Sequence, residues 1–160
     1  MRQRAYRHVR ARGRAPLARS ARLTTVADTG AIYALLDRRD AWHERVRGWW
    51  ESGTGEVLLP VTILPEITYL VQRRKGIEAE TGFVRAVAVG ELTVEPLEPG
   101  DFDRSAELMQ DYRDLPLGFV DATVVAVAER LDAGSVLTTD RRHFAIVRPR
   151  HVERLRLAPA

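Results

Sequence analysis

The chain has 160 residues, of which 45% are hydrophobic, so it can bury the core of one domain without covalent staples. It contains no cysteine, which excludes disulfides and thiolate metal sites, so that any metal must be held by oxygen or histidine ligands. Its apolar runs are too short for a bilayer span or a secretory signal, and we expect a cytoplasmic protein without membrane contact.

The net charge of +3 is distributed unevenly. Residues 1–22 contain eight arginines and no acid, whereas residues 23–160 hold the other 17 basic residues and all 22 acids, a charge of −5. The first segment has few large apolar residues, which predicts a disordered tail. Three explanations of this tail stay open: a nucleic-acid-binding arm, an amphipathic targeting peptide, or a start codon assigned too far upstream. Residues 23–160 are expected to form the folded domain.

The first predicted elements are a strand and two helices. Residues 23–27 form a short β-prone run that ends at Asp28, and the apolar spacing of residues 31–36 is helical. His43, in the second helix, is predicted to pack or to lie at the surface. That helix has an apolar stripe, expected mostly in the core but with part open to a partner, which consists of Trp42, Val46, Trp49 and Trp50.

Strands and helices alternate in the rest of the chain. The helix at 119–128 is apolar except for Asp121 and Thr123, which predicts burial over most of its circumference. Residues 96–100 are predicted to be a connector. Further strands are predicted at 57–59, 92–94, 135–138 and 152–157, and further helices at 62–76, 77–88, 102–113 and up to Ile146. This alternation predicts an α/β fold with a parallel sheet of four or five strands and helices on both faces.

Four carboxylates occupy comparable places in this pattern, each at a strand end or at the start of the helix that follows: Asp28, Glu66, Asp121 and Asp140. Each alone is explained as a helix cap or as an acid near the positive end of a helix dipole. Together they would crowd negative charge into one crevice, where like charges cannot all ionise without a counter-ion. Oxygen ligands favour Mg²⁺ or Mn²⁺, and such a site suits the hydrolysis of a phosphodiester.

Other polar residues around this crevice have two interpretations each. The Thr138 hydroxyl either supports a carboxylate or a metal-bound water, or simply reflects the strand propensity of threonine. Six basic residues are predicted either to contact phosphate or to be solvated surface charges: Arg73, Arg74, Lys75, Arg113, Arg141 and Arg142.

Four segments follow one another over residues 23 to about 150: VADTGAIYALLD, ILPEITYLV, LPLGFVDATVVAVAERL and LTTDRRHF. In this order and spacing they resemble the PIN-domain ribonucleases, most closely the VapC-type toxins of bacterial type II toxin–antitoxin pairs. The resemblance implies a three-layer α/β/α sandwich with a five-stranded parallel sheet, and a metal-dependent endoribonuclease activity. It assigns Mg²⁺ or Mn²⁺ to Asp28, Glu66, Asp121 and Asp140, with Thr138 in support.

The resemblance also implies partners. They are an RNA substrate (transfer, ribosomal or messenger RNA), a second copy of the chain in a homodimer, and a cognate VapB-type antitoxin that wraps the toxin and blocks the acidic pocket. Gly30 departs from the family pattern, because many relatives carry a hydroxyl residue there. The arginine-rich tail is the larger departure, and it leaves the true N-terminus open.

Three rival functions are weighed against this one. A haloacid-dehalogenase-like phosphatase needs a second acid two residues after its first aspartate, and that position is Gly30. A catalytically silent PIN-fold module that binds RNA or an antitoxin has no need of four clustered acids. A nucleotide-binding fold is disfavoured because the chain has no Gly-rich phosphate loop.

Overall fold

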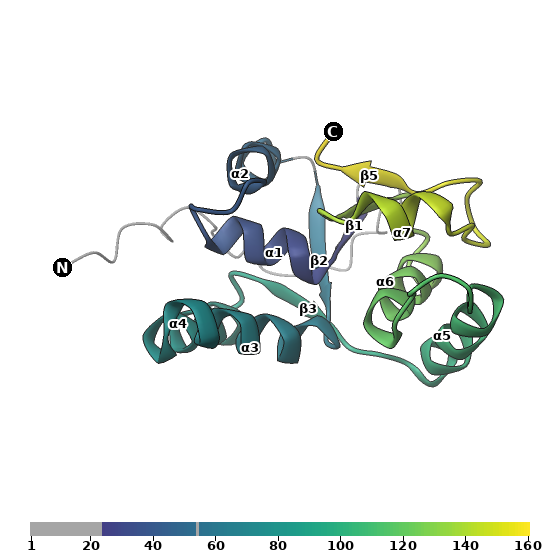
Figure 1. Cartoon of the computed structure of the whole chain (residues 1–160), viewed down its shortest axis with the longest axis horizontal. Helices are drawn as coiled ribbons and strands as arrows, with labels where there is room; N and C mark the ends of the chain where they lie inside the picture. Colours follow the sequence, from purple (N-terminus) through teal and green to yellow (C-terminus); the bar gives the residue numbers. More distant parts are fainter. Residues whose placement is uncertain (1–23, 54) are drawn as a thin grey trace.

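The computed structural model describes residues 24–53 and 55–160 and contains a five-stranded, fully parallel sheet (Figure 1). The predicted tail, residues 1–22, lies outside the described residues. The strand order is β3-β2-β1-β4-β5, so the first strand lies at the centre. The strands are β1 (Thr24–Ala27), β2 (Glu56–Pro60), β3 (Thr93–Glu95), β4 (Ser135–Leu137) and β5 (Arg156–Ala158). The predicted parallel sheet is confirmed, with five strands.

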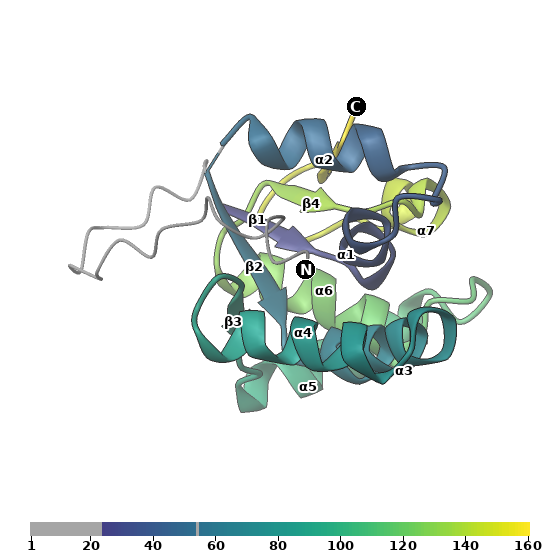
Figure 2. The same cartoon turned by 90° about the vertical axis from the view of Figure 1, so that its left-hand side faces the viewer.

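Helices flank this sheet and complete the predicted sandwich (Figures 1 and 2). They are α1 (Thr29–Leu36), α2 (His43–Glu51), α3 (Ile63–Lys75), α4 (Ile77–Ala88), α5 (Pro99–Asp111), α6 (Phe119–Arg130) and α7 (Arg141–Ile146). Helix α6 lies across β1, β2 and β4 and packs along α5, while α1 packs against both α2 and α3. None of the helices in the described part of the chain has the length and apolar character that a bilayer span requires.

The centre of the fold is buried as its sequence predicts. All four residues of β1 are buried, and so is every residue of α6 from Ala122 to Ala128. A strand with neighbours on both edges and helices on both faces has no solvated side, which explains why its sequence does not alternate. The prediction that α6 is buried over most of its circumference is confirmed.

Two predicted boundaries are wrong. Helix α5 begins at Pro99, inside the predicted connector, because Glu98 and Asp101 form a reciprocal capping box and Pro99 suits the first helical position. The last strand is Arg156–Ala158, at the end of the predicted run and one residue beyond it, since residues 151–154 form a bend. It is an edge strand, as predicted.

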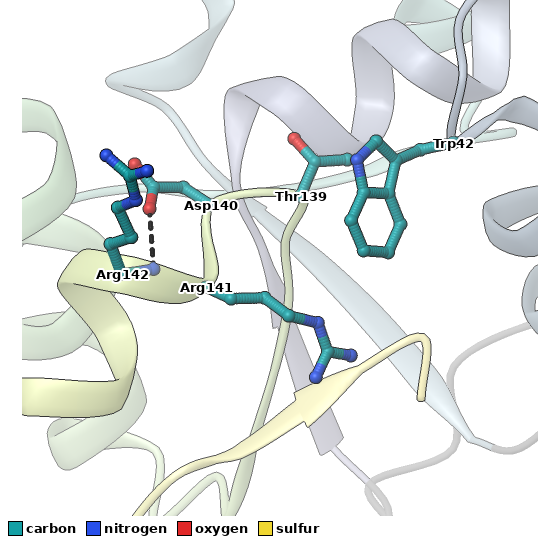
Figure 3. A pocket seen from close by; sticks show the side chains of 5 residues that line it. All are labelled: Trp42, Thr139, Asp140, Arg141 and Arg142. Atoms are coloured by element: carbon teal, nitrogen blue, oxygen red, sulfur yellow. Dashed lines mark hydrogen bonds between the residues drawn. The ribbon is translucent and has the colours of Figure 1, made fainter.

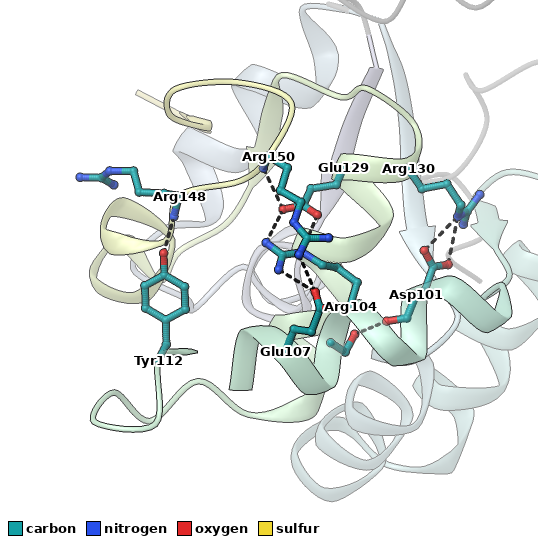
Figure 4. Close-up of polar contacts among 9 residues, drawn as sticks. Asp101, Arg104, Glu107, Tyr112, Glu129, Arg130, Arg148 and Arg150 are labelled. Atoms are coloured by element: carbon teal, nitrogen blue, oxygen red, sulfur yellow. Dashed lines mark hydrogen bonds and ion pairs between the residues drawn. The ribbon is translucent and has the colours of Figure 1, made fainter. Parts of the chain in front are cut away.

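An arginine network joins α5, α6 and the loop before β5 (Figure 4). Arg130 donates to both oxygens of the buried Asp101 at 3.0 Å and to Glu95 at 3.0 Å. Arg104 makes two hydrogen bonds to Glu129, and Arg150 binds Glu107 at 2.7 Å. The network consists of Glu95, Glu98, Asp101, Arg104, Glu107, Glu129, Arg130 and Arg150.

Candidate active site

The candidate site forms where the two central strands end. The backbone N–H of Asp28, directly after β1, donates to the carbonyl of Leu137, the last residue of β4, at 2.9 Å. The Thr138 hydroxyl then donates to Asp28 Oδ2 at 2.8 Å. Of the two interpretations of Thr138, support of a carboxylate is the one its hydrogen bond fits. This edge is where the carboxyl ends of parallel strands place ligands in open α/β sheets.

Asp28 also begins helix α1, so its capping role and its place in the pocket coexist. Its Oδ1 accepts from the backbone N–H of Thr29 at 2.7 Å. The Thr29 hydroxyl donates to Glu66 Oε2, on the first turn of α3, at 2.7 Å. Thr29 therefore links the carboxylates of Asp28 and Glu66, which lie 38 residues apart in the sequence.

Asp140 is linked to Asp28 in a similar way. Its backbone N–H donates to Thr138 Oγ1 at 2.9 Å, and the same hydroxyl donates to Asp28. The Asp140 side chain caps α7 by accepting from the backbone N–H groups of Arg142 and His143. Thr138 is fully buried, which fixes these two acids relative to each other.

His143 completes the cluster, and the sequence analysis did not single it out. Its Nδ1 lies 2.9 Å from Asp140 Oδ2 and 3.9 Å from Asp121 Oδ2, the acid on the first turn of α6. The contact with Asp140 lacks hydrogen-bond geometry, so we treat it as electrostatic. The spacing of three from Asp140 on one helix face was the available signal. Each pair of neighbouring acids is therefore bridged by one residue: Thr29, Thr138 or His143.

The pKa values of two of these acids are raised by burial and by the neighbouring negative charges. Burial is the main cause that raises the pKa of Asp28, and with the charges of Asp121 and Asp140 it brings that pKa to about 6 against the opposing hydrogen bonds from Thr138 and Thr29. Burial also raises the pKa of Asp121, which the charge of His143 lowers and the charges of Asp140 and Glu66 raise. The four carboxylates thus act on one another across one pocket.

The donor set suits a hard divalent cation, because it consists of carboxylate oxygens whose mutual repulsion such an ion relieves. Within the described residues, no three acidic or histidine side chains converge closely enough to hold one metal ion as they stand. Glu66 is turned toward Thr29, and Asp140 toward the start of its own helix. Coordination by these acids therefore requires side-chain rotation away from these hydrogen bonds.

Gly30 is favoured here by close packing. A Cβ added at this position would overlap Thr139 Oγ1, so a side chain at position 30 requires the Thr139 side chain to move. The departure from the family pattern at Gly30 has a local physical reason.

The predicted phosphate contacts have varied surroundings. Lys75 forms an ion pair with Asp37 at 2.9 Å, and the guanidinium of Arg74 lies over the Tyr33 ring. Arg141 and Arg142 line an open cleft next to Asp140 (Figure 3).

His43 is buried with Nδ1 2.8 Å from the Ala34 carbonyl, so it is a packing histidine.

Comparison with known proteins now decides the family. The family model described as "PIN domain" matches residues 25–148. This chain is a PIN-domain protein. It is 30% identical over 124 residues to Ribonuclease VapC26 of Mycobacterium tuberculosis, an alignment that covers 78% of this chain and 92% of that protein. It therefore belongs to the VapC ribonuclease toxins within the PIN family.

Solved structures agree on the fold. The Mycobacterium tuberculosis VapC20, described as a "Sarcin-Ricin loop cleaving toxin", superposes with a TM-score of 0.67 at 24% identity and covers 74% of this chain and 91% of its own. A toxin–antitoxin complex from Klebsiella pneumoniae gives a TM-score of 0.61 at 17% identity, with 77% and 92% covered. The predicted PIN-like sandwich is confirmed.

Proposed function

We propose that this PIN-domain protein is a metal-dependent endoribonuclease that hydrolyses RNA phosphodiester bonds with Mg²⁺ or Mn²⁺. The observation that carries the proposal is the pocket of four bridged carboxylates, Asp28, Glu66, Asp121 and Asp140, on the fold of the VapC ribonucleases. No lysine or arginine within the described residues lies within ion-pair distance of any of them. This arrangement of carboxylates suits the binding of a divalent cation.

The residues of the pocket have separate roles in this proposal. The four carboxylates hold the cation, and Asp28 is the most buried of them, with 5% of its surface exposed. Thr138 is a positioning residue, because its hydroxyl donates to Asp28 while it accepts from the Asp140 backbone. Thr29 positions Glu66 through a hydrogen bond that would have to open for Glu66 to ligate a cation. A bound Mg²⁺ or Mn²⁺ supplies an acidified water for the attack and stabilises charge on the leaving oxygen.

Cleavage of total RNA tests the proposal. The 160-residue protein, purified free of partners and verified as folded, is incubated with RNA in Mg²⁺, in Mn²⁺ and in EDTA, beside the Asp121→Ala variant. We expect discrete fragments that require both the metal and Asp121. Fragments that persist in EDTA, or in Asp121→Ala, would exclude the carboxylate site as their source.

The alternative is a catalytically silent PIN-fold module that binds RNA or an antitoxin. Its support is the absence, within residues 24–53 and 55–160, of three convergent ligands around one point. The same experiment separates the two functions, because a silent module binds RNA but yields no fragments with either metal.

Partners follow from the same proposal. We propose a cognate VapB-type antitoxin, since similar structures include a toxin–antitoxin complex from Klebsiella pneumoniae and VapBC2 from Rickettsia felis. A homodimer and a transfer, ribosomal or messenger RNA substrate complete the proposal, whose physiological outcome is the inhibition of translation. Co-expression with a candidate VapB-type antitoxin tests this partner: a stable complex that no longer cleaves RNA is expected, and cleavage by the complex would contradict it.

A further inference from the structure

A cleft beside the acid pocket has no role in the chemistry proposed above. It has a volume of about 410 Å³ and is lined by Trp42, Thr139, Asp140, Arg141 and Arg142 (Figure 3). This volume lies within the range of small-ligand sites in proteins. Because Asp140 belongs to both, the cleft begins where the acid pocket ends.

Trp42 is held in a fixed position at the wall of this cleft. Its backbone N–H donates to Asp40 Oδ1 at 2.8 Å, which orders the turn between α1 and α2. The next residue, His43, is buried against the Ala34 carbonyl, and Val46 is fully buried one turn further on. The indole is half-buried and belongs to a rigid part of the fold, so its remaining surface is preorganised for binding.

Two guanidinium groups lie over the Trp42 ring. Arg141 lies with Cζ 5.7 Å from the ring centroid and also donates to the Pro159 carbonyl, which fixes it. Arg45 lies 5.2 Å from the same centroid. In the part of the chain that the structure describes, the Arg45 side chain makes no hydrogen bond or ion pair, so it can move aside. The cleft thus presents a fixed indole and a fixed guanidinium plane beside a mobile cation.

The charge of this region differs from that of the domain around it. The cleft lining holds two arginines, Arg141 and Arg142, against one acid, Asp140, whereas residues 23–160 together carry −5. Arg45 adds a third positive charge over the Trp42 ring. Phosphate is therefore attracted here and repelled by the neighbouring acids until a cation neutralises them. Aromatic rings and arginine planes next to positive charge are what bind unpaired nucleotides, because every base offers a face for stacking.

We propose that this cleft binds an unpaired nucleotide next to the scissile phosphate, with its base stacked against Trp42 and the Arg141 guanidinium. The inference rests on the proposed ribonuclease function, because it places the cleft beside the reacting phosphate. A base that is paired and stacked in a duplex cannot enter the cleft without being extruded. Trp42 and Arg141 therefore restrict cleavage to unpaired segments of RNA.

Binding and cleavage are measured separately to test this. Binding is followed by the fluorescence anisotropy of a labelled single-stranded RNA octamer of mixed sequence, and of its duplex. All measurements contain Mg²⁺, and every protein also carries Asp121→Asn so that the RNA is not cleaved. We expect Trp42→Leu to weaken octamer binding by about 5- to 100-fold, as for the loss of one stacked base. Trp42→Phe, which keeps an aromatic face, should weaken it far less. Duplex binding should change little in either variant.

Arginine variants separate stacking from charge. Arg141→Lys keeps the charge but loses the planar guanidinium, so octamer binding should weaken while duplex binding holds. Arg47→Gln is the matched control, because Arg47 lies on the exposed face of α2 and, among the described residues, its ion pairs are with Glu44 and Glu51. It should leave the preference for single strands unchanged. If Trp42→Leu does not fold, Arg141→Lys and Trp42→Phe decide the question.

The outcomes distinguish the two proposals. If the Trp42→Leu variant folds and binds the octamer as tightly as the wild type does, the proposal of base binding in the cleft is wrong, even if the protein cleaves RNA. Equal losses for octamer and duplex also overturn it, since charge alone would explain them. If wild-type protein never cleaves but octamer binding depends on Trp42, the ribonuclease proposal fails and the base-binding cleft stands. In an active enzyme, Trp42→Leu should raise KM for RNA more than it lowers kcat.

Discussion

Two acidic regions of this protein neutralise their charge in opposite ways. In the arginine network, every acid has a guanidinium nitrogen within 3.4 Å: Glu95, Glu98, Asp101, Glu107 and Glu129. In the acid pocket, no lysine or arginine among the described residues lies within 4 Å of an acid, and the basic side chain within that distance is the His143 imidazole. Burial does not separate the regions, since Asp101 is 2% exposed and Asp28 is 5% exposed.

The partners of a buried acid indicate whether it stabilises the fold or is available to bind a ligand. A buried acid with a guanidinium partner is neutralised within the chain, and removal of that partner leaves a buried negative charge uncompensated. An acid whose neighbours are other acids raises the free energy of the folded chain until a cation arrives. The two regions should therefore respond oppositely to loss of charge.

The largest expected effect is on cleavage by Asp28→Asn. This variant keeps the shape of the side chain but removes the charge proposed to hold the metal, so RNA cleavage should fall on the order of 1,000-fold, equivalent to about 4 kcal/mol. The rate of fragment formation from total RNA measures this. Asp111→Asn, on the exposed end of α5, is the matched control and should cleave normally. Unchanged cleavage in Asp28→Asn would remove Asp28 from the site.

The next effect is on the stability of the network. Arg130→Met removes the guanidinium partner of the buried Asp101, so the free energy of unfolding should fall by about 3 kcal/mol. Urea unfolding followed by circular dichroism measures it. Arg47→Met, which breaks only exposed pairs, should change stability by less than about 1 kcal/mol. Equal losses in the two variants would contradict the contrast between the regions.

The raised pKa of Asp28 should make the stability of the protein depend on pH. The Asp28 carboxyl has a pKa of about 6 in the folded chain and about 4 in an unfolded one. Between these values the folded state binds a proton that the unfolded state does not. Stability in EDTA should therefore fall as pH rises from about 4 to about 6, by on the order of 2 kcal/mol.

Asp28→Asn should flatten this part of the profile and should leave the metal-free protein at pH 7 as stable as the wild type, or more stable. Urea unfolding at several pH values in EDTA measures both. A wild-type stability that rises steadily from pH 4 to pH 6, with the same profile in the variant, would show that the pKa of Asp28 is not raised in the folded chain.

The smallest effect is stabilisation by metal. Mg²⁺ at ten times its dissociation constant should add about 1.4 kcal/mol by preferential binding to the folded state, a rise in Tm of a few degrees. Thermal unfolding with and without Mg²⁺, in the absence of RNA, measures this. The rise should persist in Arg130→Met and vanish in Asp28→Asn. A rise that is equal in all three proteins would place the metal elsewhere.

Much of the fold could be predicted from the sequence because its central elements are uniform. The four buried residues of β1 and the seven of α6 leave no polar face, and such runs predict buried parallel elements directly. Boundaries set by side-chain hydrogen bonds were harder to predict. The start of α5 depends on the reciprocal hydrogen bonds of the capping box formed by Glu98 and Asp101, which the spacing of apolar residues cannot predict.

The site could be predicted in part. The positions of the four acids after strands or at helix starts indicated one crevice, since parallel strands end at one edge. Of the residues that bridge them, Thr138 was one for which the sequence suggested support of a carboxylate, whereas the roles of Thr29 and His143 could not be predicted because they depend on rotamers. Thr29 reaches Glu66 across 37 residues, and Thr138 reaches Asp28 across 110. Trp42 was assigned mainly to the core by its helical spacing, which does not reveal that the indole borders a cleft.

The central place of β1 sets when the site can form during synthesis. β1 is made early, but its neighbour β4 pairs through residues 110 positions later, and this pairing brings Thr138 to Asp28. Chain growth delivers β4 and β5 last, so a nascent chain lacks half of its acidic pocket until nearly all residues have left the ribosome. Under the proposed ribonuclease function, a partly synthesised chain without β4 and Asp140 would therefore lack a complete metal site.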